Sequence, residues 1–226
     1  DVEITFEEMV RGVKKNIHLR KLSRCDNCYG TGGKQGSKEN NCSDCNGTGK
    51  MRRVTQTIFG SFEQMSVCER CRGRGKIYAE KCQTCNGAGR VQKTEDITVE
   101  IPAGIDDQQT LSIRSAGEAG EDGAPAGDLF VNVHVRQHPL FKRRGDDIVS
   151  QLEITFAQAA LGDKLNINTI DGEMKMKIPS GTQHGEVFRV RGRGVAHLGR
   201  FGRGDHLVTI ILRVPTKLSL HEKELI

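Results

Sequence analysis

All eight cysteines of this 226-residue chain occur as four Cys-x-x-Cys pairs, and two glycines follow each pair at a constant offset. The pairs are Cys25/Cys28, Cys42/Cys45, Cys68/Cys71 and Cys82/Cys85. Structural zinc is held by four ligands at the corners of a tetrahedron, and one Cys-x-x-Cys pair supplies two of them as thiolates. The four pairs therefore predict two Zn²⁺ ions, each bound by two pairs.

Two other uses of paired cysteines fit this pattern less well. Disulfide frameworks of secreted proteins rarely space every cysteine as Cys-x-x-Cys. A redox-active pair of the thioredoxin kind normally occurs once, where a strand meets a helix, and not four times among glycines. A thiol–disulfide oxidoreductase or isomerase is kept as an alternative function.

The glycines after each cysteine pair have a structural task. The backbone must turn back so that its N–H groups point at the thiolate sulfurs, which requires a positive φ or a very close approach of two backbones. Glycine tolerates both. The eight glycines expected to do this are Gly30, Gly32, Gly47, Gly49, Gly73, Gly75, Gly87 and Gly89.

The rest of the chain is an internal repeat. The tetrapeptide EITF begins at Glu3 and again at Glu153, an offset of 150 residues, and IPAG from Ile101 matches IPSG from Ile178, an offset of 77. The first copy therefore carries about 73 additional residues, and the cysteine segment lies within them. We expect two related domains, the first of which is interrupted by the cysteine segment.

The position of the insertion bears on how the cysteine pairs combine. An inserted segment leaves and re-enters its host at neighbouring points, so its first and last pairs should lie together near the base. This favours Cys25/Cys28 with Cys82/Cys85, and Cys42/Cys45 with Cys68/Cys71 farther out. Sequential grouping, first pair with second and third with fourth, remains open.

The apolar pattern of the host domains is that of β-strands. Apolar residues alternate with polar ones, which is typical of sheets with one buried face. The alternating runs are 2–6, 97–101, 129–135, 174–178 and 210–214. Short helices are expected at Glu7–Arg11 and Ala157–Leu161, each closed by a glycine, and a third should begin at the capping box of Ser219. The predicted fold class is mainly β, with two tandem homologous β-sandwich-like domains.

Composition excludes several classes of protein. No apolar run approaches the ~20 residues that span a bilayer, so no membrane partner is expected. The net charge of +5 and the aromatic content of 4% argue only weakly for nucleic acid. A zinc-dependent nucleic-acid-binding protein stays an alternative. The start at Asp1, without methionine, suggests a piece of a longer protein.

These features together resemble a known family. Four Cys-x-x-Cys-x-Gly-x-Gly units inserted into the first of two β-repeats, with IPAG, IPSGTQHGEVFRVRGRGV, GDLFV and RQHPLFKRRGDDI, resemble the C-terminal half of a type I DnaJ co-chaperone. The resemblance covers essentially the whole chain. It implies that the J-domain is absent, since the single His-Pro here is followed by Leu140.

The resemblance also implies a domain plan. The first client-binding β-domain would comprise 1–24 and 91–137, the zinc domain 25–90, and the second β-domain 138–215. Residues 216–226 would begin a truncated C-terminal dimerisation helix. The full-length protein would be a homodimer, and a monomer stays open for this fragment.

By the same resemblance, the chain is not an enzyme. It would bind unfolded or misfolded polypeptides, prevent their aggregation and deliver them to a DnaK-class ATP-dependent chaperone. Clients would add as a strand to a groove formed by Ile17, Leu19, Ile97 and Val131, although alternating apolar residues are more often core. The inner zinc site would support client holding and the outer one transfer to the DnaK-class partner. Zinc thiolates fit a reducing compartment, the cytoplasm or an organelle matrix.

Overall fold

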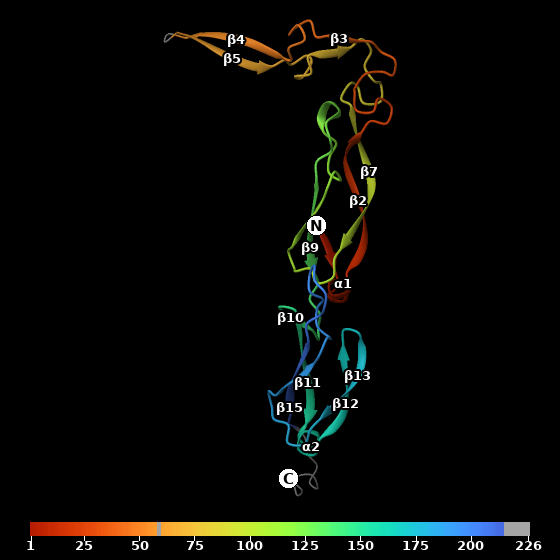
Figure 1. The fold of residues 1–226 in the computed structure, drawn as a ribbon, viewed down its shortest axis with the longest axis vertical. Coiled ribbons are helices and arrows are strands. Elements are labelled where there is room, and N and C mark those ends of the chain that lie inside the picture. Colours follow the sequence, from red (N-terminus) through yellow and green to blue (C-terminus); the bar gives the residue numbers. More distant parts are fainter. Residues whose placement is uncertain (58–59, 215–226) are drawn as a thin grey trace. The chain divides into compact units, whose positions relative to one another are not determined.

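The computed structural model describes residues 1–57 and 60–214 and shows a mainly β protein (Figure 1). The predicted fold class is confirmed: the chain is mainly β, two related β-repeats follow one another, and the cysteine segment interrupts the first. The third helix, expected from Ser219, lies outside the described residues. None of the helices in the described chain is long and apolar enough to span a membrane.

Two short helices and fifteen strands, with one 3-10 turn at Glu121–Gly123, make up the described chain. The helices are α1 (Phe6–Arg11) and α2 (Phe156–Leu161). The strands are β1 (Val2–Ile4), β2 (Val13–Arg24), β3 (Glu39–Asn41), β4 (Lys50–Thr57), β5 (Gly60–Val67), β6 (Lys76–Tyr78), β7 (Arg90–Ile101), β8 (Thr110–Ile113), β9 (Leu129–Val135), β10 (Lys142–Arg144), β11 (Asp147–Thr155), β12 (Asp163–Thr169), β13 (Gly172–Ile178), β14 (Val187–Val190) and β15 (His206–Arg213).

The internal repeat of the sequence is also a repeat of topology. The first copy has a sheet of order β1-β9-β8, and the second has β11-β15-β14 with β10 added at one edge. In both copies the first two strands are parallel, with Val2 opposite Val133 and Leu152 opposite Ile210. These two pairs are related by the offsets of 150 and 77 residues. The copies therefore share strand order, strand direction and register.

Each copy has a second, two-stranded layer, β2-β7 in the first and β12-β13 in the second. In the second copy both layers contribute side chains to one apolar core, in which residues such as Ile154, Ile178 and Ile210 are at most 1% exposed. The strands β2 and β7 are longer than β12 and β13 because they continue to the cysteine segment. The chain leaves β2 at Arg24 and re-enters β7 at Arg90.

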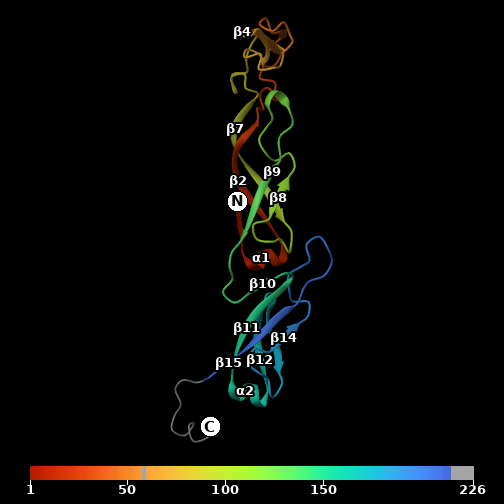
Figure 2. The ribbon, with the colours of Figure 1, turned by 90° about the vertical axis from the view of Figure 1, so that its left-hand side faces the viewer.

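The two helices occupy equivalent positions and form for the same local reason. In α1, the Thr5 side chain accepts the Glu8 N–H and the Glu8 side chain accepts the Thr5 N–H, and Thr155 and Gln158 do the same for α2. Such capping boxes satisfy the N–H groups that a helix start leaves free. A glycine at φ near +80° ends each helix. Figure 2 shows α2 where β11 turns towards β12.

The chain divides into two compact units. One comprises Asp1–Lys15, Thr98–Leu111 and the chain from Val131 onward, and the other comprises Asn16–Ile97 and Ser112–Phe130. The second unit contains all the cysteines. The finer division into three domains and a dimerisation helix stays a prediction.

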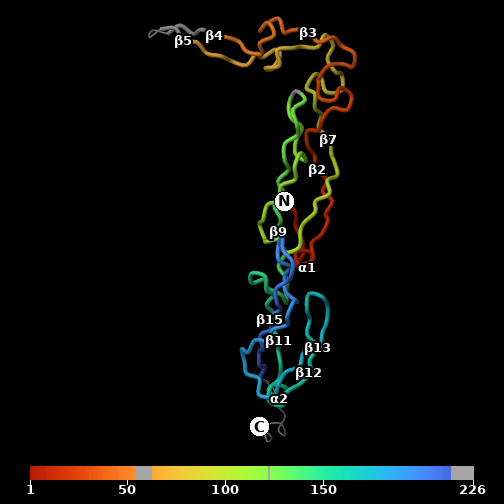
Figure 3. Tube along the Cα trace, viewed as in Figure 1, coloured from red at the N-terminus to blue at the C-terminus, as the bar shows by residue number. Residues whose placement is uncertain are grey.

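The cysteine segment has little regular structure apart from two small antiparallel pairings. Strand β3 pairs with β6, and β4 pairs with β5 as a hairpin. The tube in Figure 3 follows the chain out through β3 and β4 and back through β5 and β6. The backbone makes four tight turns, one at each cysteine pair; two of them lie between these strands, one precedes β3 and one follows β6.

Candidate metal centres

Eight buried cysteines form two separate groups of four. The inner tetrad consists of Cys25, Cys28, Cys82 and Cys85. The outer tetrad consists of Cys42, Cys45, Cys68 and Cys71. Within each tetrad all sulfur atoms lie within 4.8 Å of one another, and every cysteine is at most 7% exposed. The structure thus combines the first pair with the last and the two middle pairs with each other, and the sequential grouping is not the one seen.

The sulfur spacing fits a tetrahedral metal ion. In the inner tetrad Cys25 Sγ lies 3.9 Å from Cys82 Sγ, and Cys28 Sγ lies 3.7 Å from Cys85 Sγ. The corresponding outer distances are 3.9 and 3.6 Å. A tetrahedron with metal–sulfur bonds of ~2.3 Å has edges of about 3.8 Å. Each group of four could therefore hold an ion, and four thiolates are a donor set typical of structural zinc.

The second glycine after each cysteine pair points its N–H group at sulfur, which the sequence predicts for the glycines of these turns. The Gly32 N–H lies 3.3 Å from Cys28 Sγ, and the same bond recurs in the other three turns at 3.2 to 3.3 Å. All eight glycines have φ between 73° and 91°. Since these N–H groups favour a charged sulfur, the turns are prepared for thiolates.

Backbone bonds also join the two cysteine turns of each tetrad. The Cys25 N–H donates to the Gly89 carbonyl at 3.0 Å, and the Cys82 N–H donates to the Gly32 carbonyl at 2.9 Å. In the outer tetrad the corresponding bonds run from Cys42 to Gly75 and from Cys68 to Gly49. The grouping of cysteines therefore does not depend on the sulfur atoms alone.

The second glycine of each turn is also a point of close backbone approach. A Cβ atom on Gly49 would lie 2.2 Å from the Gly73 carbonyl oxygen, and one on Gly75 would lie 2.2 Å from the Gly47 oxygen. The inner tetrad repeats this contact between Gly89 and Gly30 at 2.4 Å. Any side chain here would separate the two turns. These positions need glycine for space as well as for φ.

One backbone feature escaped the sequence reasoning. The residue after the second cysteine of each turn has a left-handed conformation although it is not glycine. These residues are Tyr29, Asn46, Arg72 and Asn86, with φ between 47° and 52°. The two asparagines are a usual signal for this conformation, but tyrosine and arginine are not. The constant offset from cysteine could have revealed all four.

Without metal, the thiols of each tetrad differ in acidity. The Cys85 N–H contributes most to lowering the pKa of Cys82 to about 6, whereas burial raises the pKa of Cys85 to about 11. Burial opposes ionisation of Cys45, but the Gly49 N–H and neighbouring thiols outweigh it and lower its pKa to about 7. For Cys68 a backbone N–H favours the thiolate, but burial and neighbouring thiols raise the pKa to about 11. A metal ion would remove this inequality, because bound cysteines are thiolates.

Each tetrad also has a cation beside it. The Arg70 guanidinium donates to the Asp44 carboxylate at 2.6 Å and interacts favourably with Cys42 and Cys68. Lys93 pairs with Asp26 beside the inner tetrad. Four thiolates around a divalent ion leave a net charge of −2, which neighbouring cations partly offset.

The four residues expected in the client groove differ in accessibility. Ile17 and Leu19 lie on the same face of β2, because they are two residues apart, and both are half-buried. Ile97, on the paired strand β7, is half-buried too. Val131 is different, since it is only 2% exposed in β9. Its side chain is not accessible to a client in this structure.

Comparison with known proteins gives a single answer. The family model for the DnaJ C terminal domain matches residues 1–215. The chain belongs to this family. Its DnaJ relatives include the "Chaperone protein DnaJ" of Ruminiclostridium cellulolyticum, which is 46% identical over 224 residues, 99% of this chain and 59% of the relative.

Two further relatives carry the same name. The protein of Acetivibrio thermocellus is 43% identical over 225 residues, which are 100% of this chain and 58% of the relative. The protein of Haloarcula marismortui is 43% identical over 223 residues, which are 99% of this chain and 58% of the relative. This chain therefore spans about three-fifths of the length of the DnaJ proteins that it matches. The resemblance drawn from the sequence is confirmed, and the relatives are named chaperones, in agreement with the expectation of a chain that is not an enzyme.

Proposed function

We propose that this chain is the client-binding part of a DnaJ co-chaperone. It binds unfolded or misfolded polypeptides, limits their aggregation and delivers them to a DnaK-class ATP-dependent chaperone. The match of the DnaJ C terminal domain model across residues 1–215 carries this proposal. The whole protein would act as a homodimer in the cytoplasm or an organelle matrix.

Two Zn²⁺ ions would be the cofactors, one in each tetrad, with the eight cysteines as ligands. Zinc supplies a structural cross-link between distant parts of the chain and no reaction. The cysteine turns prepare the sites by aligning N–H groups with sulfur and by pairing their backbones across each tetrad. The inner tetrad starts directly after β2 and closes just before β7, so it would keep these two strands in register for client holding. The outer tetrad would take part in transfer to the DnaK-class partner.

The client would bind along β2. Strands β2 and β7 form a sheet of only two strands, so among the described residues no third strand continues the sheet beyond β2. Such an edge can accept an extended peptide through main-chain hydrogen bonds. The half-buried side chains of Ile17 and Leu19, with Ile97 beside them on β7, would then contact the apolar side chains of the client.

An aggregation assay tests this function. The chain, added to a thermally unfolded protein, is expected to suppress light scattering, and removal of metal by a chelator should reduce this suppression. Replacing Ile17 and Leu19 by serine should abolish peptide binding while the chain stays folded, because both side chains are only half-buried. Serine at His18 and Arg20 is the matched control, since these exposed residues occupy the other face of the same strand.

Three results would contradict the proposal. Unfolding of the Ile17/Leu19 variant would assign both residues to the core. Equal loss of binding in the His18/Arg20 control would show that the face of β2 does not matter. Binding of RNA or DNA that weakens steeply with salt, without suppression of aggregation, would favour the nucleic-acid alternative.

A further inference from the structure

A pocket of about 400 Å³ lies where the first β-repeat meets the second. We call it the junction pocket and define it by Phe6 and Met9 of α1, Arg136 after β9, and Phe141, Lys142 and Arg143 at the start of β10. All of these residues belong to the same compact unit. The pocket shares no lining residue with the metal tetrads or with the client face of β2.

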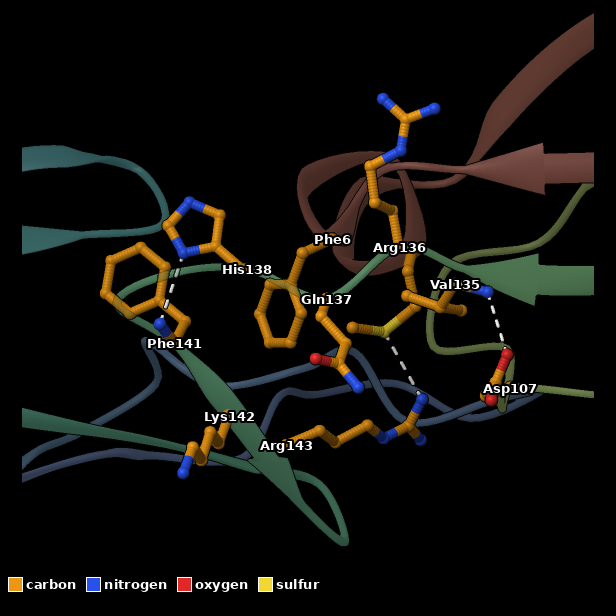
Figure 4. A pocket seen from close by; sticks show the side chains of 10 residues that line it. Phe6, Asp107, Val135, Arg136, Gln137, His138, Phe141, Lys142 and Arg143 are labelled. Carbon is orange, nitrogen blue, oxygen red and sulfur yellow. Dashed lines mark hydrogen bonds between the residues drawn. The ribbon is translucent and has the colours of Figure 1, made fainter.

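The apolar side of the junction pocket is aromatic and rigid. Phe6 and Phe141 are 5% and 6% exposed, with ring centroids 6.2 Å apart. The His138 ring stacks on Phe141 at 4.7 Å, and its Nδ1 accepts the N–H groups of Leu140 and Phe141 at 3.1 Å. Figure 4 shows the three rings together on one side of the pocket. A preformed aromatic surface of this kind suits a flat apolar side chain.

Three cationic side chains also line the pocket, and they differ in how far other groups already neutralise them. Arg136 is paired with Glu3 at 2.6 Å. Arg143 donates to the Ile105 carbonyl at 2.6 Å and pairs with Asp106 at 2.9 Å.

Lys142 differs from both arginines. Its side chain is exposed and lines the pocket, and the described structure gives its ammonium group no ion pair or hydrogen bond. Among the described residues that line the pocket, Asp107 is the one carboxylate, and it accepts the Val135 N–H at 2.8 Å. The ammonium group of Lys142 is therefore available to bind an anion beside the aromatic rings of the pocket.

We infer that the junction pocket binds a short acidic peptide segment, with an aromatic side chain against Phe6 and Phe141 and an adjacent carboxylate facing Lys142. The volume accommodates one or two side chains, and charge complementarity selects an anion over a neutral group. Phe156, the counterpart of Phe6 in the second repeat, is 71% exposed, so the described part of that repeat does not bury the equivalent ring.

Methionine methyl NMR tests this site directly. Of the five methionines of the chain, only Met9 lines the junction pocket. The probe is the peptide N-acetyl-Glu-Phe-Glu amide, raised to about 10 mM because a contact of this size is expected to have a millimolar dissociation constant. We expect a saturable shift of the Met9 methyl signal while the other methionine signals stay in place. The neutral probe N-acetyl-Gln-Phe-Gln amide should bind at least about threefold more weakly, the range of one exposed ion pair.

Variants separate this site from the client face. Lys142→Glu should weaken binding of the acidic probe severalfold, whereas Lys142→Arg should preserve the affinity. Lys164→Glu, which changes an exposed lysine of the second repeat, should leave the affinity unchanged. The Ile17/Leu19 serine variant should leave the Met9 response unchanged, so failure of either proposal can be recognised separately. An unmoved Met9 signal, equal affinity for the acidic and neutral probes, or unchanged affinity after Lys142→Glu would each overturn the inference.

Discussion

The β-repeats and the cysteine segment are stabilised in different ways. In the second repeat, strands and helix surround a continuous apolar core that includes Ile154, Ile178 and Ile210. In the cysteine segment the buried clusters are the two tetrads themselves, with Val91 against the inner one and Met51 and Ile77 against the outer one. So small an apolar area cannot offset the conformational entropy of folding. The chain thus combines regions that are stabilised by the burial of apolar side chains with a region that needs a bound metal ion to fold.

Of the changes considered, removal of metal should produce the largest difference in stability between the cysteine segment and the β-repeats. A chelator is expected to abolish amide protection in residues 25–89, because metal binding is the main source of folding free energy there. Strands β11 and β15 should keep their protection, since their core contains no cysteine. Hydrogen exchange followed by mass spectrometry measures both regions in one experiment. Protection lost equally in β11 and β15 would mean that the repeats also depend on metal.

Truncation of the phenylalanine that begins each helix should destabilise the first repeat much more than the second. Phe6→Ala is expected to lower the free energy of unfolding by about 3–5 kcal/mol, because it removes a buried ring. Phe156→Ala, at the equivalent position, should change it by no more than about 0.5 kcal/mol, because that ring is 71% exposed. Urea unfolding measures both values, and the zinc content of each variant should stay at two. Equal decreases in the free energy of unfolding would show that the exposed face of α2 is buried in solution.

Substitution of one glycine should act on the outer tetrad alone. In Gly49→Ala the new methyl would meet the Gly73 carbonyl at 2.2 Å, which disturbs the N–H bond to Cys45. Changes in such supporting bonds lower metal affinity about 10- to 100-fold. Gly36→Ala is the control, because Gly36 has a similar φ of 77° but no atom within 4 Å of a new Cβ. Competition with a zinc-binding dye should show weakened affinity for one ion in Gly49→Ala only.

A smaller effect is expected from a buried histidine in the second repeat. His206 is fully buried with Nε2 2.7 Å from Ser150 Oγ, and burial lowers its pKa. Below pH ~6.5 the unfolded chain takes up a proton that the folded chain resists. Stability from the neutral ring is therefore complete above this pH and is lost as the pH falls.

The measurement is the urea midpoint of the second repeat between pH 8 and pH 5. His206→Leu, which introduces the residue found at the equivalent position 129, should make the midpoint less dependent on pH. If the urea midpoints of the wild type and of the variant depended on pH equally, groups other than His206 would cause the loss of stability in acid.

Much of this organisation could be predicted from residue spacing. The constant offset of glycine from cysteine indicated tight turns around sulfur, and the two repeat offsets indicated where the cysteine segment is inserted. These offsets favoured the nested grouping of cysteines and left sequential grouping open, and the structure has the nested grouping. Such features depend on chain connectivity and local geometry, which a sequence records directly.

Other features depend on contacts that the sequence does not record. Phe6 continues the apolar alternation of β1, yet it begins α1 because Thr5 and Glu8 form a capping box. The burial of Val131 depends on strands from distant parts of the chain, so alternation alone could not separate it from Ile17. The left-handed conformation of Tyr29 is imposed by the cysteine turn and not by its own preference.

Cadmium NMR of the metal-substituted chain reports directly on which cysteines share an ion. We expect two ¹¹³Cd resonances, each coupled to the β-protons of four cysteines. One should correlate with Cys25, Cys28, Cys82 and Cys85, and the other with Cys42, Cys45, Cys68 and Cys71. A single resonance that correlates with both Cys25 and Cys42 would show that the cysteines are not grouped as two nested tetrads.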